Sequence, residues 1–431
     1  MSKSSAFKLP LYVQVIIGVT LGAIFGVVFG RAPIVWGIGN TELGALGMLV
    51  IRMLKALAVP LVLFAILDAF LRTEISGRRG LRLILICLVN VSVAFAIGLT
   101  LMNVIQPGSG SRVQLEKLKE HPDPEAAAPI ALSARASISP LKAIDSYVPE
   151  SLVEPFLENS VIPVVLLGLL FGAAIRRQGE RHGGPDMQAV ASFVHGTFQV
   201  LMQTLGWVIL AVPYAVFGVV AHVVGKAGLS VFIGLAPFLG IVLLGFTLHA
   251  LLYYPAMAWF FGGKSPRVYL GQGLDAVLTS LSTNSSLATV PVTLRCLTEK
   301  MGVSHSSARM AACVGTNLNN DGITLYEAMA ALFIAQALGL DLTLGQQTVV
   351  VLASLMAGIG IAGIPEAGLV MLPLVLGAMG LSTEMVAVAI AFVLPVDWIL
   401  ARCRSAVNVL SDMLVAILLD RDQPVSVPVV S

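Results

Sequence analysis

The sequence predicts an all-α protein that lies in a membrane and crosses it several times. Hydrophobic residues make up 57% of the 431 residues, and charged residues make up only 12%. The mean hydropathy is +0.91. A water-soluble fold has too little interior to bury so much apolar surface. In addition, six segments are apolar for long enough, about 20 residues, to cross a hydrocarbon layer as helices.

The first of these segments follows Lys3 and Lys8, as the apolar part of a signal peptide would, but it has no obvious small-residue cleavage site. We therefore expect it to remain as a membrane helix. The two longest segments must tilt or break, and Pro213, Pro237 and Pro255 are candidate break points. The six segments are Leu9–Gly30, Leu43–Leu71, Leu83–Ser111, Asn159–Ile175, Met187–Gly225 and Ala227–Gly263.

Basic residues gather at every second connection between these segments, which predicts the membrane orientation because Lys and Arg are enriched in cytoplasmic loops. The pattern places the N-terminus in the cytoplasm and predicts a multi-pass protein of the cell's inner (plasma) membrane. The polar insert Arg112–Glu150 is rich in Pro, Ala and Ser, which is typical of an external loop. The basic clusters are Lys3 and Lys8; Arg72, Arg78, Arg79 and Arg82; Arg176, Arg177 and Arg181; and Lys264 and Arg267.

Composition and motifs argue against several classes of function. The formal charge is only +2, without a dense basic patch, so we expect no nucleic acid partner. The four cysteines stand singly in apolar surroundings and are predicted to be buried thiols: Cys87, Cys296, Cys313 and Cys403. The six histidines, among them His249 and His305, show no ligand spacing. Without a zinc-protease motif, a nucleophile elbow or a P-loop, we expect neither an enzyme nor an ATP-driven pump, and no cofactor beyond a coupling ion.

After Lys264 the apolar stretches become short and contain small polar clusters in two similar units. The first unit has a tip at Ser282–Pro291 and a helix interrupted at Asn317–Gly322, and the second has a tip at Ala362–Gly368 followed by a helix over Glu384–Asp420. Non-helical backbone survives at membrane depth only where it lines a cavity or is buried in protein. Paired interruptions of this kind indicate a transporter's binding site.

The last helix carries a polar stripe, because residues at offsets of 0, 7, 11 and 15 share one helix face. The stripe consists of Asp397, Arg404, Asn408 and Asp412. Charged residues inside a membrane helix are costly, so a functional role is the first interpretation; the alternative is a structural ion pair or a snorkelling helix end. The guanidinium of Arg404 has the geometry to hold a carboxylate with two hydrogen bonds.

The interrupted helix offers oxygen ligands of the kind that hard cations prefer. Asn319, Asn320 and Asp321 supply them where the helix unwinds, and Asp321 with Asp412 can balance the charge of Na⁺. The alternative is a solvated turn. The first tip offers the hydroxyls of Ser285 and Ser286 with backbone N–H groups ahead of a helical arm, which suits a carboxylate; a simple loop is the alternative.

These motifs, in this order and spacing, resemble the glutamate transporter family, also called the dicarboxylate/amino acid:cation symporters. The resemblance rests on the serine tip, Asn319–Gly322, Ala362–Gly368 and Val396–Asp412. Before residue 265 it is looser and rests on Ile51–Pro60 and Asn159–Ile175.

The resemblance implies eight transmembrane helices plus two re-entrant helical hairpins, inverted repeats, and scaffold and transport domains that form a homotrimer in the lipid bilayer. It implies transport by an elevator movement. The expected organisation is three helices in residues 1–106, an extracellular loop in 107–150, helices four to six in 151–263, a transport core in 264–421 and a cytoplasmic tail in 422–431.

The resemblance also assigns binding residues, position by position. The expected substrate contacts are Ser285, Ser286, the backbone of Gly363, Ala401, Arg404, Ser405 and Asn408. Asn319, Asn408 and Asp412 are expected to hold one sodium ion, with Asp321 and Asn319 helping a second and Gly315 contributing to the metal site.

Several positions depart from the family pattern. Relatives that carry acidic amino acids usually have an Asp at the position of Ala401, which holds the substrate's amino group. Because Arg404 remains, we predict a small carboxylate substrate, in the first place a C4-dicarboxylate such as succinate, fumarate or malate. A symporter of acidic or neutral amino acids is the alternative, and a channel is another.

Other departures affect the expected coupling. Asn320 replaces a Met, Ile323 and Ile361 replace Thr residues, and Cys87 and Asn90 stand where a Tyr and a Thr help a sodium site. We therefore expect Na⁺ coupling with altered stoichiometry, and protons are the alternative. Glu366, at the second tip, either tunes gating or faces water, and we favour the exposed position.

Overall fold

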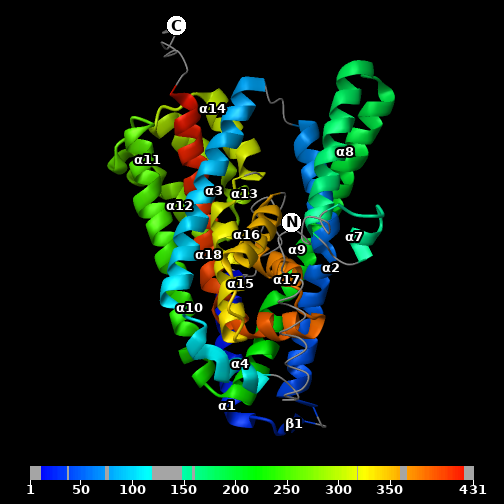
Figure 1. The fold of residues 1–431 in the computed structure, drawn as a ribbon, viewed down its shortest axis with the longest axis vertical. Helices are drawn as coiled ribbons and strands as arrows, with labels where there is room; N and C mark the ends of the chain where they lie inside the picture. Colours follow the sequence, from blue (N-terminus) through cyan, green and yellow to red (C-terminus); the bar gives the residue numbers. More distant parts are fainter. Residues whose placement is uncertain are drawn as a thin grey trace, which may run out of the picture.

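The chain folds as a bundle of long helices that run roughly along one common axis, with two short strands at one end (Figure 1). The computed structural model describes residues 11–35, 38–72, 77–118, 148–157, 161–317, 319–359 and 366–421. This architecture confirms the predicted all-α class. The strands β1 (Pro33–Val35) and β2 (Ile38–Gly39) pair antiparallel.

The first half of the chain contributes mostly long helices, and the second half mixes short helices with one long one. The helices of the first half are α1 (Leu11–Phe29), α2 (Asn40–Arg72), α3 (Gly77–Ile105), α4 (Arg112–Leu118), α7 (Glu154–Leu157), α8 (Val161–His182), α9 (Pro185–Ala227), α10 (Ser230–Thr247) and α11 (Tyr254–Phe260). Those of the second half are α12 (Gln272–Thr283), α13 (Ser286–Arg295), α14 (His305–Arg309), α15 (Asp321–Ala337), α16 (Leu344–Gly358), α17 (Ala367–Ala378) and α18 (Thr383–Asp420).

Within the described residues, five helical spans are long and apolar enough to cross a membrane: Asn40–Asp68, Arg79–Ile105, Pro185–Ala227, Ser230–Phe260 and Thr383–Asp420. Four of the six predicted segments correspond to spans in this set, whereas Leu9–Gly30 and Asn159–Ile175 correspond to α1 and α8, which are not among the five. The bounds differ most at Leu83–Ser111. There α3 ends at Ile105, because Gln106 takes a left-handed conformation (φ 48°) before Pro107. Ser109–Ser111 then form a separate 3₁₀ turn.

In the described structure, the helical run continues through each of the three candidate prolines. Helix α9 continues for 43 residues through Pro213, and α10 continues through Pro237. At about 1.5 Å per residue, α9 is about 64 Å long, so it must tilt or project beyond the bilayer. Pro255 lies in the first turn of α11, directly after a π-helical turn at Leu248–Tyr253, where a missing N–H costs least.

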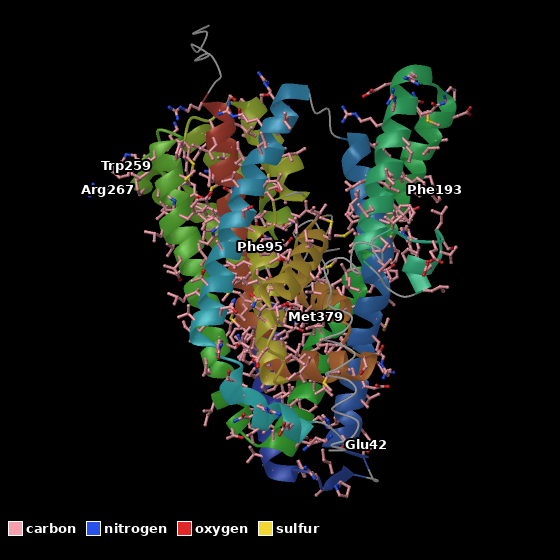
Figure 2. The ribbon with its side chains drawn as sticks, viewed as in Figure 1. Glu42, Phe95, Phe193, Trp259, Arg267 and Met379 are labelled. Atoms are coloured by element: carbon pink, nitrogen blue, oxygen red, sulfur yellow. The ribbon has the colours of Figure 1, made fainter. Side chains whose placement is uncertain are left out.

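Large apolar side chains cover the outside of the bundle (Figure 2). Phe193 is 66% exposed and Trp259 is 55% exposed, whereas Met379 in the interior is 0% exposed. Apolar patches this extensive on an outer surface indicate contact with lipid. Cys87 and Cys296 are buried free thiols and Cys403 is half-buried, as predicted; the side chain of Cys313 lies outside the described residues.

Two packing neighbourhoods meet in the bundle. Helix α9 packs along α1 and α2, while α18 contacts α10, α12, α13, α15 and α17 (Figure 1). Of the expected domain boundaries, residues 119–147 of the loop and 422–431 of the tail lie outside the described residues. Helix α18 thus stands where the short helices of the second half converge, and it positions the site.

Candidate functional site

The helix that was predicted to be interrupted does break. The 3₁₀ turn Gly315–Asn317 ends the segment that follows α14, and α15 begins at Asp321; Leu318 between them lies outside the described residues. Asn320 takes a non-helical conformation (φ −101°, ψ 52°). Its side-chain amide donates to the Gly358 carbonyl at 2.8 Å, which ties the break to the end of α16.

Helix α18 packs directly on this break. A Cβ on Gly322 would lie 2.5 Å from the Arg404 carbonyl oxygen, so a larger residue would separate the two helices. Asn408 joins both sides: its Oδ1 accepts from the Gly322 N–H at 2.8 Å, and its Nδ2 donates to Asn320 Oδ1 at 3.2 Å. The predicted ligand Asn408 therefore also holds the unwound chain in place.

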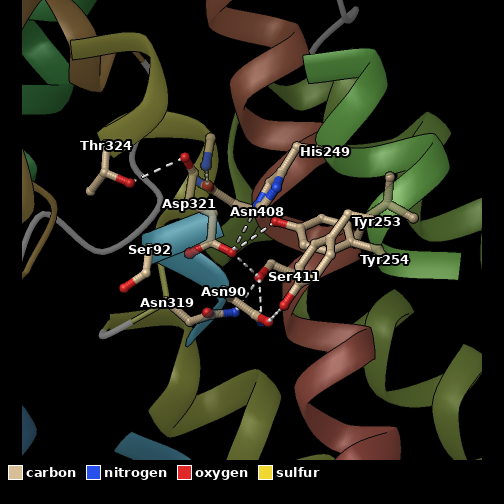
Figure 3. Close-up of polar contacts among 12 residues, drawn as sticks. Asn90, Ser92, His249, Tyr253, Tyr254, Asn319, Asp321, Thr324, Asn408 and Ser411 are labelled. Atoms are coloured by element: carbon tan, nitrogen blue, oxygen red, sulfur yellow. Dashed lines mark hydrogen bonds and ion pairs between the residues drawn. The ribbon is translucent and has the colours of Figure 1, made fainter. Parts of the chain in front are cut away.

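Asp321 sits in a buried cluster of hydrogen-bond donors (Figure 3). Its Oδ2 accepts from the Tyr254 hydroxyl at 2.8 Å and from the Ser411 hydroxyl at 2.7 Å, and His249 Nε2 lies 3.4 Å away. The cluster joins α15 to α18 and to the segment between α10 and α11. His249 was expected to be structural or at the surface; it is buried beside the candidate site, and its position within the apolar segment Ala227–Gly263 was the available signal.

A second part of the same cluster surrounds Asn319. Its Nδ2 donates to Ser411 Oγ at 2.7 Å, and Ser411 is therefore shared between Asn319 and Asp321. Asn90 on α3 lies 3.5 Å from the same hydroxyl and accepts from the Tyr253 hydroxyl at 3.0 Å (Figure 3). Asn90, which departs from the family pattern, thus contributes to the cluster.

Asp412 lies one residue beyond Ser411 and is held differently. Its Oδ2 accepts from the Thr316 hydroxyl at 2.6 Å. Its Oδ1 and the Oδ1 of Asn319 are buried and have no hydrogen-bond partner in the described part of the chain. The carbonyl of Gly315, beside Thr316, accepts from the Asn319 N–H at 2.7 Å. Unpaired buried oxygens are costly, and a cation is a fitting partner.

The described residues contain no group of three or more His, Cys, Asp or Glu side chains that could hold a metal ion. A cation at Asp412 would therefore depend on amide, hydroxyl and backbone oxygens with a single carboxylate. A donor set of neutral oxygens with one negative charge suits a monovalent hard cation better than a transition metal.

Arg404 is buried, and Asp397 on the preceding turns of α18 holds it with two hydrogen bonds, of 3.0 and 3.3 Å. The guanidinium lies 4.0 Å from the centre of the Tyr326 ring. On another side it meets α17, where a Cβ on Gly368 would lie 1.9 Å from Arg404 Nη1. The structural ion pair that was the alternative interpretation is therefore present, although three of the five N–H donors of Arg404 make no hydrogen bond to the described residues.

The first tip turns between α12 and α13. Ser285 caps α13, since its hydroxyl accepts from the Ala288 N–H at 3.1 Å. Ser286 is buried, and its hydroxyl has no partner among the residues described. Asn284 takes a left-handed conformation (φ 52°) and accepts from the Ser405 hydroxyl at 3.3 Å, which brings the predicted Ser405 to the tip.

The second tip meets the first. Glu366 has φ 57° and accepts a hydrogen bond from Asn284 Nδ2 at 2.8 Å, and it is 4% exposed. The prediction that Glu366 faces water is therefore wrong, because the first tip covers it. The predicted Gly363 lies outside the described residues. Ala401, one turn before Ser405 on α18, is buried.

Two buried side chains near Arg404 were not among the predicted site residues. Tyr326 stacks on the guanidinium, and both carboxylate oxygens of Glu327 lack a partner within the described residues. Glu327 is close enough to interact electrostatically with Arg404 and Asp397. Glu327 could have been identified from the sequence, because it is a lone Glu in the apolar helix α15.

Comparison with known proteins covers nearly the whole chain. The model of the sodium:dicarboxylate symporter family matches residues 11–422. Mouse excitatory amino acid transporter 3 is 29% identical, over 93% of this chain and 83% of its own length. The proton/sodium-glutamate symport protein of Bacillus subtilis is 27% identical, over 96% of this chain and 93% of its own. Mouse excitatory amino acid transporter 1 is 35% identical, over 59% of this chain and 46% of its own.

Proposed function

Since this chain belongs to the sodium:dicarboxylate symporter family, we propose that it carries acidic amino acids across a membrane in symport with Na⁺. The observation that carries the proposal is Arg404, a buried guanidinium between the second tip and the Tyr326 ring with donors left for a substrate carboxylate. The names of the relatives, which are glutamate and excitatory amino acid transporters, support the amino acid class.

Reconstitution of the full chain into liposomes tests this function. We expect an inward Na⁺ gradient to drive accumulation of labelled L-aspartate or L-glutamate, and dissipation of the gradient to abolish it. Neutral amino acids such as L-serine belong in the same panel. Failure of every amino acid to accumulate under any imposed gradient would exclude the proposal.

A C4-dicarboxylate such as succinate is the second candidate, and it comes from the first prediction. Its support is the buried Ala401, which provides no carboxylate for a substrate ammonium group. The relatives favour the amino acid, so the dicarboxylate takes second place. Uptake of labelled succinate that exceeds uptake of labelled L-aspartate under the same gradient would reverse this order.

Na⁺ is the proposed coupling ion, with Asn319, Asp412 and Gly315 as the proposed ligands and Asp321 beside them. The unpartnered oxygens of Asn319 and Asp412 support this assignment. Coupling to protons is the alternative, supported by the buried and unpartnered carboxylate of Glu327. A pH gradient imposed without Na⁺ separates the two: proton coupling predicts accumulation under that condition, and Na⁺ coupling does not.

The proposal includes the elevator movement, the re-entrant hairpins and the homotrimer that the resemblance implies. A cleft of about 880 Å³ lies between α2 and α9 on one side and α17 and α18 on the other, with mostly apolar lining residues. Such an apolar boundary supports sliding of the part that contains α17 and α18 past the part that contains α2 and α9. Cysteine pairs placed across this cleft should stop uptake when oxidised and release it when reduced, and the mass of the purified protein in detergent tests the trimer.

A further inference from the structure

The buried charges around Arg404 are unbalanced. Asp397 already pairs with Arg404 through two hydrogen bonds. Glu327 and Glu366 are also buried, and Glu366 interacts electrostatically with Asp397 and Arg404. Among the fully buried groups this makes three carboxylates for one guanidinium, with the half-buried Arg402 at the edge. A ligand that brings positive charge would stabilise the ionised form of these buried carboxyl groups.

Glu366 borders this cluster from the second tip. Its Oε1 is held by Asn284, and Asn284 is held by Ser405. Ser405 lies four residues after Ala401, so the two share a face of α18. Two residues after Glu366, the backbone of Gly368 lies against Arg404. Asn284 thus links the carboxylate of Glu366 to the face of α18 that carries Ala401, where the family's ammonium-binding Asp is missing.

The backbone at this point is strained in a way that favours a role beyond packing. Glu366 and Asn284 both take left-handed conformations, with φ of 57° and 52°. Asn tolerates this region well, but Glu does not, and a non-Gly residue there costs about 1 kcal/mol or more. In addition, the donor found for this carboxylate in the described residues is a neutral amide. A carboxyl group buried in this way is more stable as the carboxylate when a cation lies beside it.

We propose that Glu366 binds the ammonium group of the substrate and supplies, from the second tip, the negative charge that Ala401 lacks on α18. This inference rests on the proposed amino acid function and makes it more specific: Arg404 takes a carboxylate of the substrate and Glu366 takes the amino group. It also explains how a chain without the Asp can carry an amino acid.

Glu366→Gln is the central test, because Gln keeps the shape and can still accept from Asn284 while losing the charge. In liposomes, the KM for L-aspartate should rise about 10- to 100-fold, as expected for loss of a charged hydrogen-bond partner. Inhibition of uptake by succinate, which has no ammonium group, should not weaken. Glu299→Gln, which alters an exposed carboxylate paired with Arg295 on the preceding turn, is the matched control and should behave as wild type.

Two further variants separate charge from structure. Glu366→Asp keeps the charge and loses the 2.8 Å contact with Asn284, so its KM for L-aspartate should stay closer to wild type than that of Glu366→Gln. In the double variant Glu366→Gln/Ala401→Asp, the carboxylate returns on α18, and the KM for L-aspartate should recover.

The opposite results would overturn the inference. These are a KM in Glu366→Gln within about twofold of wild type, equal weakening of L-aspartate and succinate, a larger loss in Glu366→Asp than in Glu366→Gln, or no recovery in the double variant. Each of these leaves the proposed function standing, because wild type would still carry L-aspartate. Wild-type protein that carries no amino acid would instead exclude the proposed function and this inference together.

Discussion

Asp321 and Asp412 are two buried carboxylates beside the same helix break, yet the protein surrounds them differently. Oδ2 of Asp321 receives the hydroxyls of Tyr254 and Ser411, with His249 next to it. Asp412 receives the Thr316 hydroxyl on one oxygen, and its other oxygen has no partner within the described residues. Asn319, which bonds to Ser411, has a similarly unpaired oxygen.

The difference indicates which of the two carboxylates is better suited to bind a cation. Donors supplied by the protein already compensate much of the charge of Asp321, and its place at the first residue of α15 adds the favourable helix dipole. The unpaired oxygens of Asp412 and Asn319 have no such compensation. We therefore propose that Na⁺ binding depends on Asp412 more than on Asp321, and the following variants test that ranking.

The largest effect is expected for Asp412→Asn, which removes the charge and keeps the size of the side chain. The Na⁺ concentration for half-maximal L-aspartate uptake should rise about 100-fold or more, because even residues outside the first ligand shell contribute 10- to 100-fold to metal affinity. Asp275→Asn, which alters an exposed carboxylate paired with Lys300, is the control. An unchanged Na⁺ dependence would refute the ranking.

Asp321→Asn should have a smaller effect on Na⁺ and a clearer one on folding. We expect the half-maximal Na⁺ concentration to shift by less than about tenfold, and the free energy of unfolding to fall by about 1–3 kcal/mol, because the hydroxyls of Tyr254 and Ser411 lose a charged acceptor. Na⁺ titration of uptake and thermal unfolding in detergent measure the two effects. A Na⁺ shift as large as that of Asp412→Asn would remove the distinction between the carboxylates.

Ser411→Ala removes the hydroxyl that connects the two parts of the cluster. Asp321 loses a donor and Asn319 loses the acceptor that orients it, so we expect a loss of about 1–2 kcal/mol in the free energy of unfolding. Because Asn319 is a proposed ligand, the Na⁺ dependence should also shift by a few-fold. The free energy of unfolding of Ser411→Cys, which keeps a weak donor, should lie between those of Ser411→Ala and wild type. Equal stability of the three proteins would contradict the bridging role of the Ser411 hydroxyl.

The smallest effect is expected for Tyr253→Phe. Its hydroxyl donates to Asn90 at 3.0 Å and is not bonded to either carboxylate in the described structure. The free energy of unfolding should fall by less than about 1 kcal/mol, with no change in Na⁺ dependence. Tyr254→Phe, next to it in the chain, should cost more because its hydroxyl bonds to Asp321. The reverse order in thermal unfolding would mean that Asp321 does not depend on these donors.

Much of the helical architecture could be predicted because it depends on local pattern. Long apolar runs give the bounds of α1, α2, α9 and α18 to within a few residues, since a membrane helix needs a minimum apolar length. The break at Asn317–Gly322 could also be predicted, because an Asn-Asn-Asp-Gly string interrupts an apolar helix. The failures occurred where neighbours outweighed a local signal, as at Pro213, which the packed helix α9 carries without a break.

The sequence predicted which residues belong to the candidate site, but not which residues they bond to. The stripe of Asp397, Arg404, Asn408 and Asp412 follows from helix periodicity alone. The bond between Asn284 and Glu366 joins residues 82 positions apart, and the bond between Tyr254 and Asp321 joins residues 67 positions apart. No local pattern encodes such pairings, and for this reason an exposed position was favoured for Glu366 and no role at the site was predicted for His249.

By itself, the sequence determined that this protein is a helical membrane protein with polar groups where its C-terminal helices break, because apolar length and residue order are properties of the chain alone. Only the tertiary structure decided which of those polar groups face each other. Whether hydrogen-bond donors compensate the charge of a buried carboxylate depends on helices that are distant from it in the sequence. That choice separates Asp321 from Asp412, and it places Glu366 against Asn284 of the first tip.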